Sequence, residues 1–395
     1  MSKKSPQLRF EGFTDDWEER KLGDVVGEIQ SGNRLPKDSL TNGDVPYVVA
    51  QTKNDGVFKK IARGTLDYNG NPMKLFPGNS ISFSIDNPEA MFYRNAEFYT
   101  SNIMRVIHED HLTHEQYVFI LENMKRFIRG YDWSRKFSGP VVSNLEYLQP
   151  SEEEQQKIGS FFKQLDDTIA LHQRKLDLLK EQKKGYLQKM FPKNGAKVPE
   201  LRFAGFADDW EERKLSDGTN KIGDGLHGTP KYSEDGEVYF VNGNNLVNGQ
   251  IVIVPETKRV TSNEQSKDDK ALNESTILMS INGTIGNLAW YRGENLMLGK
   301  SAAYIEVSDF DKKFIYAYLQ TRPVKDYYLN SLTGTTIKNL GLKAIRNTNI
   351  CTPTIDEQAK IGSFFKKLDD TIALHQRKLD LLKEQKKGFL QKMFV

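Results

Sequence analysis

The chain has 395 residues, of which 37% are hydrophobic and 28% are charged, a composition typical of a folded protein with two or three domains. Its single cysteine, Cys351, excludes an internal disulfide and a multi-cysteine metal site. No run approaches the roughly 18 consecutive apolar residues of a membrane span, and the polar N-terminus lacks the apolar core of a secretion signal. We therefore expect a cytoplasmic protein with no membrane contact.

Two copies of one framework follow each other along the chain. Residues 6–24 recur at 199–217 with few changes, and residues 158–191 recur at 361–394 with two substitutions. The offset between copies grows from 193 residues at the first pair to 203 at the second. The middle of the second copy is therefore longer, and we expect the extra residues in surface loops, where insertions are tolerated best.

Short β-type runs separated by Gly/Asn turns fill the middle of each copy. The first half contains VPYVVA, NSISFSI, MFYR and SNIMRVI, and the second contains EVYFV, QIVIV, STILMSI, LAWY and SAAYIEV. An amphipathic helix follows in each half, introduced by Thr113 with Gln116 at capping-box spacing and by Asp311 at the corresponding place. This order of elements predicts an α+β domain in each half.

Each near-identical stretch predicts one long helix. Apolar residues recur at alternating steps of four and three from Ile158 to Met190 and from Ile361 to Met393, which is the heptad seam of a coiled coil. A helix of this kind, counted from its first turn, would reach roughly 60 Å at 1.5 Å per residue, a length that suits a spacer. We expect the two helices to pack antiparallel on each other and to give the chain a pseudo-twofold internal repeat.

Polar residues interrupt the seam at equivalent positions of the two helices. His172 and His375 occupy one pair of positions, and Lys183 and Lys386 occupy the other. A polar residue on an apolar seam normally costs stability and fixes the register, so a structural role is favoured over a catalytic one. Beside the seam lies a second apolar stripe, formed by Phe161, Thr168, Leu171 and Leu178. Two paired helices need only one stripe, so the second predicts a contact with the globular domain or with a partner subunit.

Positive charge is concentrated on the long helices. The net charge of +3 for the whole chain divides into +3 and +4 for the two repeated stretches and about −4 for the remainder. Any nucleic-acid contact outside the helices must therefore rest on local basic clusters, because no domain is basic as a whole.

A glycine-rich motif in the second half resembles a dinucleotide-binding motif, but the residues that follow it do not fit such a site. Residues 223–228, GDGLHG, match the glycine pattern of a dinucleotide site, but Thr229 and Pro230 follow instead of a helix. A loop shaped by glycines explains the stretch better.

Two groups of residues resemble metal ligands. His108, His111 and His114 have no histidine counterparts in the second copy, which favours a solvated helix start over a metal site. Asp235 with Glu256 and Lys258 resembles the carboxylate and lysine pattern of metal-dependent nucleases, but Arg63 and Thr65 replace the last two in the first copy. We predict no catalytic residue and no metal ligand in the chain.

The polar residues of the two variable middles are the candidates for DNA contacts. Arg and Lys suit guanine, Asn and Gln suit adenine, and Ser and Thr suit either. In the first half the candidates are Ser31, Asn33, Arg34, Gln51, Lys53, Tyr93, Arg94, Arg135, Lys136 and Asn144. In the second half they are His227, Thr229, Lys231, Asn242, Asn244, Asn245, Ser280, Asn282, Thr284, Lys300, Thr335, Thr336 and Lys338. Each alone is typical of a surface loop, and the prediction depends on their joint placement.

The layout resembles the specificity subunit of type I restriction-modification systems over essentially the whole chain. The resemblance rests on the openings LRFEGFTDDWEERKL and LRFAGFADDWEERKL, on GLHGTPKY, VNGNNLVNGQI and MSINGTIG in the second half, and on the KIGSFF entries to both long helices. The first half departs from the pattern, with SGNRLPKD where the second has GLHGTPKY. The resemblance implies an α+β fold with two globular target recognition domains joined by two long antiparallel coiled-coil helices.

The same resemblance implies a function. Each domain would read one half of an asymmetric, bipartite site in double-stranded DNA, and the chain itself would be non-catalytic and would hold no cofactor. The implied partners are two modification (methyltransferase) subunits and the restriction (endonuclease and translocase) subunits, which would use S-adenosylmethionine, ATP and Mg²⁺. The expected boundaries are recognition domains at 1–150 and 193–354 and spacer helices at 151–192 and 355–395.

Two functions of other classes stay open. A stand-alone metal-dependent nuclease would need a catalytic constellation that neither copy shares with the other. A coiled-coil scaffold or adaptor that reads no DNA would explain the helices but not the varied polar loops.

Overall fold

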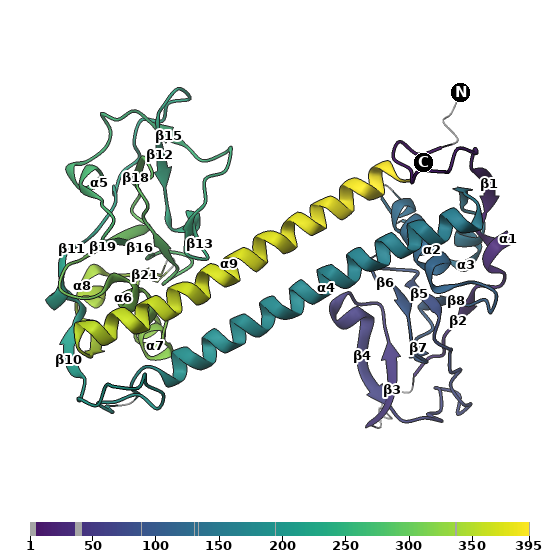
Figure 1. The fold of residues 1–395 in the computed structure, drawn as a ribbon, viewed down its shortest axis with the longest axis horizontal. Helices are drawn as coiled ribbons and strands as arrows, with labels where there is room; N and C mark the ends of the chain where they lie inside the picture. Colours follow the sequence, from purple (N-terminus) through teal and green to yellow (C-terminus); the bar gives the residue numbers. More distant parts are fainter. Residues whose placement is uncertain are drawn as a thin grey trace. The chain divides into compact units, whose positions relative to one another are not determined.

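The computed structural model describes residues 5–35, 42–87, 89–129, 131–132, 134–193, 195–335 and 338–394. The chain divides into two compact units, unit 1 from Met1–His172 with Lys378–Val395, and unit 2 from Gln173–Arg377. Each unit contains one globular body and a part of both long helices, α4 (teal) and α9 (yellow) in Figure 1.

Unit 1 combines nine short strands with three helices and a part of each long helix. Its strands are β1 (Glu18–Lys21), β2 (Gln30–Ser31), β3 (Asn42–Val48), β4 (Val57–Ile61), β5 (Ser80–Ser84), β6 (Met91–Arg94), β7 (Tyr99–Thr100), β8 (Met104–Ile107) and β9 (Glu146–Gln149). Its helices are α1 (Leu22–Val26), α2 (His114–Phe127) and α3 (Gly139–Ser143), with a 3-10 turn η1 (Lys53–Gly56) and the first part of α4 (Glu152–Lys189). These counts refer to the described part of the unit.

Unit 2 repeats this plan with additional short elements. Its strands are β10 (Glu211–Lys214), β11 (Thr219–Asp224), β12 (Val238–Val241), β13 (Leu246–Val247), β14 (Gln250–Ile251), β15 (Arg259–Val260), β16 (Thr276–Ser280), β17 (Leu288–Trp290), β18 (Leu296–Leu298), β19 (Ala302–Val307), β20 (Leu332–Thr333), β21 (Asn339–Leu340) and β22 (Asn349–Thr352). Its helices are α5 (Lys267–Ala271), α6 (Lys312–Tyr318), α7 (Arg322–Asn330), α8 (Leu342–Arg346) and the first part of α9 (Ile355–Lys392), with 3-10 turns η2 (Leu215–Gly218) and η3 (Gly243–Asn245).

The sheets of the two units have the same strand order. A four-stranded antiparallel sheet runs β2-β8-β5-β6 in unit 1 and β11-β19-β16-β17 in unit 2. A three-stranded sheet runs β4-β3-β7 and β15-β12-β18, and in both its last pair is parallel. A two-stranded ladder, β1-β9 or β10-β22, precedes each long helix. The structural neighbours described below have the same two-domain, mixed α and β architecture, so the predicted α+β class is confirmed.

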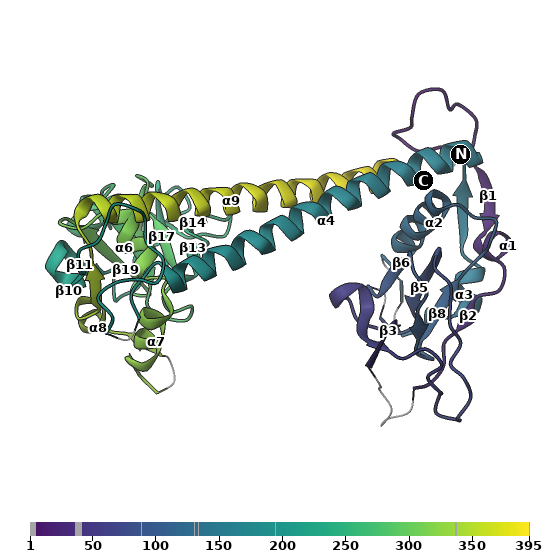
Figure 2. The same cartoon turned by 60° about the horizontal axis from the view of Figure 1, so that its bottom comes forward.

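One helix covers a face of the four-stranded sheet in each unit, α2 in unit 1 (Figure 2) and α6 in unit 2. Both start as predicted. The hydroxyl of Thr113 accepts the N–H of Gln116 (3.2 Å), and the Gln116 side chain accepts the N–H of Thr113 (2.9 Å). The carboxylate of Asp311 caps α6 by accepting the N–H of Phe314 (2.8 Å).

Both long helices contribute to both hydrophobic cores. In unit 1 the core includes Phe162 of α4 and Phe394, which follows α9. In unit 2 it includes Phe191, which follows α4, and Phe365 of α9. Each globular body is therefore closed by residues from two distant parts of the sequence, and neither body can bury its apolar surface without both helices.

Within each unit the helices α4 and α9 run antiparallel. In unit 1 the ring of Phe162 lies 5.7 Å from that of Phe394, and Asp166 pairs with Lys386. The residue numbers of the α9 side therefore decrease as those of α4 increase. In unit 2 Lys183 pairs with Asp369 and Tyr186 packs on Phe364, at 5.0 Å between rings, with the same reversed order.

A buried ion pair fastens each opening segment to the start of a long helix. In unit 1 Arg9 donates two hydrogen bonds to Glu154 on α4 (2.7 and 2.8 Å), and the indole N–H of Trp17 donates a third (3.1 Å). In unit 2 Arg202 donates the same pair to Glu357 on α9 (2.8 and 2.8 Å). The arginine of the repeated LRF motif therefore makes the same ion pair in both units, whereas, among the described residues, the tryptophan of the DW motif joins it only in unit 1.

Each run that was predicted as a strand overlaps a strand of the structure. In the first half these strands are β3, β5, β6 and β8, and in the second half they are β12, β14, β16, β17 and β19. The second half has short elements without a labelled counterpart among the described residues of the first, namely the hairpins β13-β14 and β20-β21 and the helices α5 and α7. The WEERK segments, which carry four charged residues and show no apolar alternation, form β1 and β10, and these strands were not foreseen. The domain boundaries stay a prediction.

Candidate nucleic-acid interface

In unit 1, loops from five parts of the sequence meet at one end of the four-stranded sheet. The hydrogen bonds that join them run from Asn33 N to Thr100 O (3.1 Å), from Ser101 N to Val48 O (3.3 Å), from Asn87 Nδ2 to Ala50 O (3.2 Å) and from Phe137 N to Ile85 O (3.0 Å). We call variable edge 1 the described residues of 31–35, 49–57, 84–90, 100–103 and 134–138. The candidates of the first half, apart from three named below, lie in these loops.

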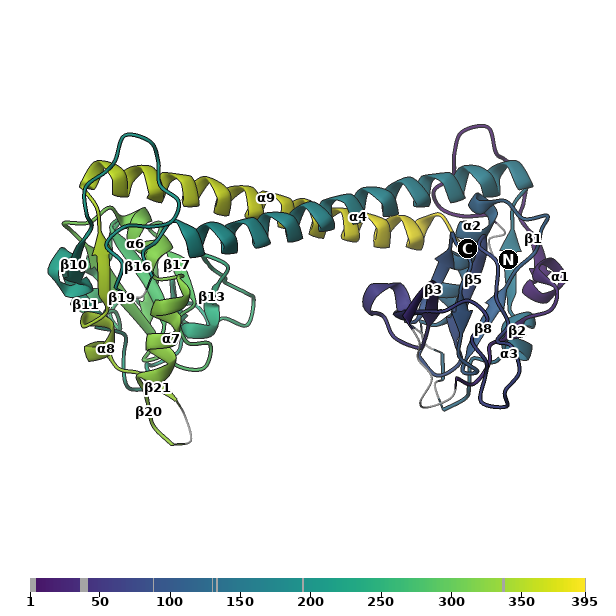
Figure 3. The ribbon, with the colours of Figure 1, turned by 90° about the horizontal axis from the view of Figure 1, so that it is seen from below.

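In unit 2, the equivalent loops meet in the same way. The connecting bonds run from Leu226 N to Leu298 O (2.7 Å), from Gly243 N to Ser301 Oγ (2.9 Å), from Ile281 N to Ser301 O (2.9 Å) and from Leu340 N to Ile281 O (2.9 Å). We call variable edge 2 the described residues of 225–231, 242–245, 280–287, 298–301 and 333–339. The β20-β21 hairpin lies at this end of unit 2, on the side away from the unit's own part of α9 (Figure 3).

Glycine is required at one equivalent position of the two edges. A Cβ atom on Gly32 would lie 2.3 Å from the carbonyl oxygen of Thr100, and one on Gly225 would lie 2.1 Å from that of Leu298. Any side chain there would separate two loops of the edge. Gly223 and Gly225 of the GDGLHG stretch therefore serve close packing, and no helix begins among the described residues from Gly223 to Pro230.

Most candidates expose their side chains on the variable edges. In unit 1 these are Ser31, Arg34, Lys53, Arg135 and Lys136, and in unit 2 they are His227, Thr229, Lys231, Asn244, Thr284, Lys300, Thr335 and Lys338. Cations predominate in unit 1, where Lys136 also faces Asp86 at 3.5 Å. Hydroxyl and amide groups are mixed with lysines in unit 2. The two edges therefore present different sets of donors and acceptors, which is what two unlike base sequences require.

A second group of candidates uses its polar atoms inside the protein. Asn33 donates to Asp67 and accepts the N–H of Lys74, and Gln51 donates to two carbonyl oxygens of its own turn. Asn245 accepts the N–H of Asn242 and donates to Val252. Such residues shape the edge, and their amides are not free to bind adenine without breaking these bonds.

Two further candidates of unit 2, Asn242 and Ser280, belong to the same internal group, whereas Asn282 does not. Asn242 accepts the hydroxyl of Ser301 (2.9 Å), and Ser280 is fully buried with its hydroxyl bonded to the loop that follows it. Asn282 is half-buried, and its Oδ1 has no partner among the described residues. The geometry favours a role in loop shape for Asn242 and Ser280.

Arg94 is buried beneath the turn at 51–56. Its side chain donates to the hydroxyl of Ser82 (2.8 Å) and lies over the rings of Phe92 and Phe98, and its Nη2 has no hydrogen-bond partner among the described residues. Burial lowers the pKa of Arg94 to about 10. The residue supports the turn from below and is not available to read bases in this conformation.

Two candidates of unit 1 lie away from variable edge 1, and one candidate of unit 2 lies outside the residues that the structure describes. Tyr93 stacks on His114 at the start of α2, with ring centroids 4.2 Å apart, and Asn144 caps α3 by donating to the carbonyl of Pro140 (2.9 Å). Thr336 lies outside the described residues.

Sequence reasoning missed one feature of variable edge 1. The guanidinium of Arg34 lies 4.8 Å from the ring centre of Tyr68, and the N–H of Tyr68 donates to the carbonyl of Arg34. Tyr68 is 61% exposed, so the pair forms a flat aromatic and cationic surface beside the loop after β2. No local motif joins two residues this far apart in the sequence, and only the fold shows the contact.

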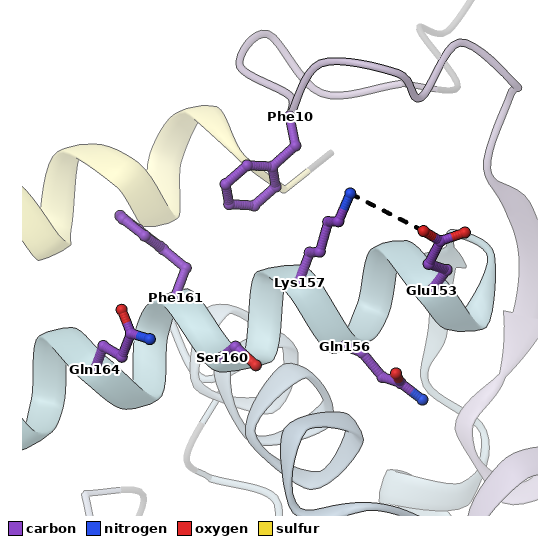
Figure 4. A pocket seen from close by; sticks show the side chains of 7 residues that line it. All are labelled: Phe10, Glu153, Gln156, Lys157, Ser160, Phe161 and Gln164. Carbon is purple, nitrogen blue, oxygen red and sulfur yellow. Dashed lines mark ion pairs between the residues drawn. The ribbon is translucent and has the colours of Figure 1, made fainter.

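A groove of about 440 Å³ lies on the framework of unit 1, where the opening segment crosses the first turns of α4 (Figure 4). It is lined by Phe10, Glu153, Gln156, Lys157, Ser160, Phe161 and Gln164. Lys157 faces Glu153 at 4.0 Å, and the lining includes no histidine or cysteine that would activate Ser160. The groove has the character of a contact surface and lacks a nucleophile with its base.

Among the described residues, no group of three His, Cys, Asp or Glu side chains is placed to hold a metal ion. In the same part of the chain, no helix combines the length and apolar character needed to cross a membrane.

The architecture defines a class of protein: two copies of one α+β recognition body on a shared helical framework, each with its own polar edge. A family model, the type I restriction modification DNA specificity domain, matches the chain twice, at residues 14–181 and 207–384. The chain belongs to this family of DNA specificity proteins, as its motifs predicted. The two matches together include both variable edges and most of both long helices.

Curated relatives and solved structures agree with the family. Two specificity subunits of type I restriction enzymes from Methanocaldococcus jannaschii are similar: MjaIX, 23% identical over 96% of this chain and 92% of its own, and MjaVIII, 21% identical over 95% and 91%. The crystal structure of a type I restriction-modification S subunit from M. genitalium matches with a TM-score of 0.70, 15% identity and 99% coverage of both chains. A chain from a study of complex assembly and conformational transition of a type I system matches with a TM-score of 0.50, 17% identity and coverage of 95% and 97%. The relatives are specificity subunits, and the prediction of a non-catalytic specificity subunit is confirmed.

Substitution of exposed residues on the variable edges is expected to weaken DNA binding in two different ways. Asn244 is exposed on η3, and Asn244→Ala should cost about 1–3 kcal/mol at one base pair and leave other positions of the site unchanged. Lys300→Ala, on the same edge, should weaken binding to all sequences alike and lower the salt slope by about one. Binding of the assembled complex to single-base variants of its site, at several salt concentrations, measures both. Uniform weakening by Asn244→Ala would show that this residue contacts the backbone.

Proposed function

We propose that the chain is the specificity subunit that reads an asymmetric, bipartite site in double-stranded DNA, with one half-site for each unit. The observation that carries this proposal is the contrast between framework and edge. The two units share strand order, anchoring ion pair and helix sequence, whereas variable edge 1 and variable edge 2 differ in nearly every exposed side chain. A duplicated frame with two unlike polar edges suits two unlike half-sites.

The helices α4 and α9 are proposed to act as the antiparallel coiled-coil spacer between the half-sites, related by a pseudo-twofold repeat. Each helix starts in one unit and ends in the other, and the two pack antiparallel inside each unit. A pair of continuous helices sets a defined separation between the sequences that are read.

The partners are proposed to be two modification subunits and the restriction subunits, which the chain positions for adenine methylation or DNA cleavage. S-adenosylmethionine, ATP and Mg²⁺ would be held by those subunits. Apolar groups left exposed on the helices support a protein partner at each unit: Leu171 and Leu381 in unit 1, and Leu178 and Leu374 in unit 2, are each more than half exposed. They are equivalent residues of the two copies, so one kind of partner would meet the same groups twice.

Expression of the chain with its modification subunit in cells that lack other methylation, followed by sequencing of methylated adenines, tests the function. We expect one asymmetric motif with two defined halves and a fixed gap, and no methylation when either protein is expressed alone. The mass of the purified complex should correspond to two modification subunits for each chain. Methylation without sequence preference would favour the scaffold alternative, and Mg²⁺-dependent cleavage by the chain alone would favour the nuclease.

A further inference from the structure

One ammonium group in unit 1 links three separate elements. Lys386 extends from α9, and its side chain is 15% exposed. Its Nζ donates to both carboxylate oxygens of Asp166 on α4 (2.8 and 2.8 Å) and to Oε1 of Glu122 on α2 (3.0 Å). The ammonium group therefore links α2, the helix that covers the four-stranded sheet, to both long helices.

Unit 2 builds the same arrangement with the long helices exchanged. Lys183 extends from α4 and donates to Asp369 on α9 (2.6 Å) and to Oε1 of Gln320, between α6 and α7 (2.6 Å). Lys183 and Asp369 are the sequence equivalents of Lys386 and Asp166. We call each set a lysine joint: Lys386, Asp166 and Glu122 in unit 1, and Lys183, Asp369 and Gln320 in unit 2.

The charges of the first joint support one another. Burial opposes ionisation of Glu122, but the ammonium groups of Lys125 and Lys386 outweigh it, and the pKa of Glu122 is lowered. Burial also opposes the charge of Lys386, but Glu122 and Asp166 outweigh it, and the pKa of Lys386 is raised. Both groups are therefore charged at neutral pH, and the joint is held by attraction between full charges.

Stability alone is a weak reason for such a joint. Apolar side chains of similar size commonly replace a buried ion pair at little cost, or even with a gain in stability. What an ammonium group adds is direction, because its N–H donors must meet acceptors at fixed places on two other elements. An apolar contact at the same place is less directional, so it constrains the angle between the elements less strictly.

We propose that Lys386 and Lys183 are positioning residues that fix how each recognition body is rotated on the helix pair, and thereby fix the gap between half-sites that the protein accepts. This inference rests on the proposed bipartite recognition. It assigns the gap to two side chains that touch no DNA, in addition to the length of the helices.

Methionine substitutions test the proposal in the assembled complex. Lys386→Met and Lys183→Met keep the length of the side chain and remove the directed bonds, and Lys387→Met and Lys184→Met are controls at exposed neighbours. Methylation is measured on DNA that contains both half-sites with the native gap or with a gap one base pair longer or shorter. We expect the preference for the native gap to fall about tenfold in each joint variant, with the bases of both half-sites unchanged and the controls like the wild type.

A charge exchange gives a second and sharper test, because the third group differs between the joints. Gln320 can donate or accept, whereas ionised Glu122 only accepts. Lys183→Asp with Asp369→Lys should therefore restore the gap preference, since Gln320 can bond either arrangement. Lys386→Asp with Asp166→Lys should not restore it, since the new aspartate would face Glu122.

A purely structural role predicts a different result. It would lower the melting temperature and reduce methylation by the same factor at every gap, and this outcome would overturn the proposal. If Lys386→Met does not assemble, Lys386→Met with Asp166→Leu removes the stranded carboxylate and is measured in its place. Failure of the bipartite proposal itself would be visible separately, as a wild-type complex whose methylated motif has no fixed gap.

Discussion

Glu154→Ala is expected to destabilise unit 1 by about 3–5 kcal/mol, because it leaves a largely buried guanidinium without its partner. Glu154 is buried, and it accepts two hydrogen bonds from Arg9 and one from Trp17. The same change in unit 2, Glu357→Ala, strands Arg202 but no indole, because the N–H of Trp210 has no hydrogen-bond partner among the described residues. We therefore expect Glu154→Ala to cost about 1 kcal/mol more than Glu357→Ala, the contribution of one buried hydrogen bond.

Hydrogen exchange localises these effects, since the two units need not unfold together. Protection should fall in β1, β9 and the first turns of α4 for Glu154→Ala, and in β10, β22 and the first turns of α9 for Glu357→Ala. Glu153→Ala is the matched control, because its exposed carboxylate lies 4.0 Å from Lys157 and should contribute less than about 0.5 kcal/mol. Equal loss of protection in Glu153→Ala and Glu154→Ala would show that the ion pair does not anchor the opening segment.

The framework could be predicted from the sequence because duplication makes its pattern visible twice. The capping box at Thr113 and the cap at Asp311 are local signals with a known geometry, and both are present in the structure, as are the two long helices α4 and α9. The ladders β1-β9 and β10-β22 were missed, because pairing across more than a hundred residues leaves no local mark on a charged stretch.

The DNA contacts stay a prediction, and what the fold adds is where the candidate side chains lie and which of their polar atoms are already bonded. Composition identifies the loops rich in Asn, Ser, Lys and Arg, and the fold brings most of them to one edge in each unit. Composition alone cannot tell whether an amide is exposed or already hydrogen-bonded within the protein. Asn244 is exposed, whereas the side chain of its neighbour Asn245 is hydrogen-bonded inside the turn. The lysine joints show the same limit, since register control was predicted for Lys183 and Lys386 but the acceptors Glu122 and Gln320 come from other elements.

Exchange of residues 25–148 for the equivalent segment of another family member is expected to change one half of the methylated motif completely and to leave the other half and the gap unchanged. The exchanged segment contains all of variable edge 1 and most of β9, whereas β1 and the long helices lie outside it. Each base pair read wrongly costs about 1–3 kcal/mol, so several changed positions abolish methylation at the old motif. Sequencing of methylated adenines gives the new motif directly.

The segment 25–148 also carries Glu122, the acceptor that the exchanged body contributes to its lysine joint, and this makes the exchange informative about the gap as well. A donor segment with Glu or Gln at that place should keep the native gap, since either side chain accepts from Lys386. A donor segment with an apolar residue there should read its new half-site with a loosened gap, and restoring Glu at that position should tighten it. If the exchange altered both halves of the motif together, the two edges would form one composite surface, and neither separate half-sites nor separate joints would describe how the protein reads DNA.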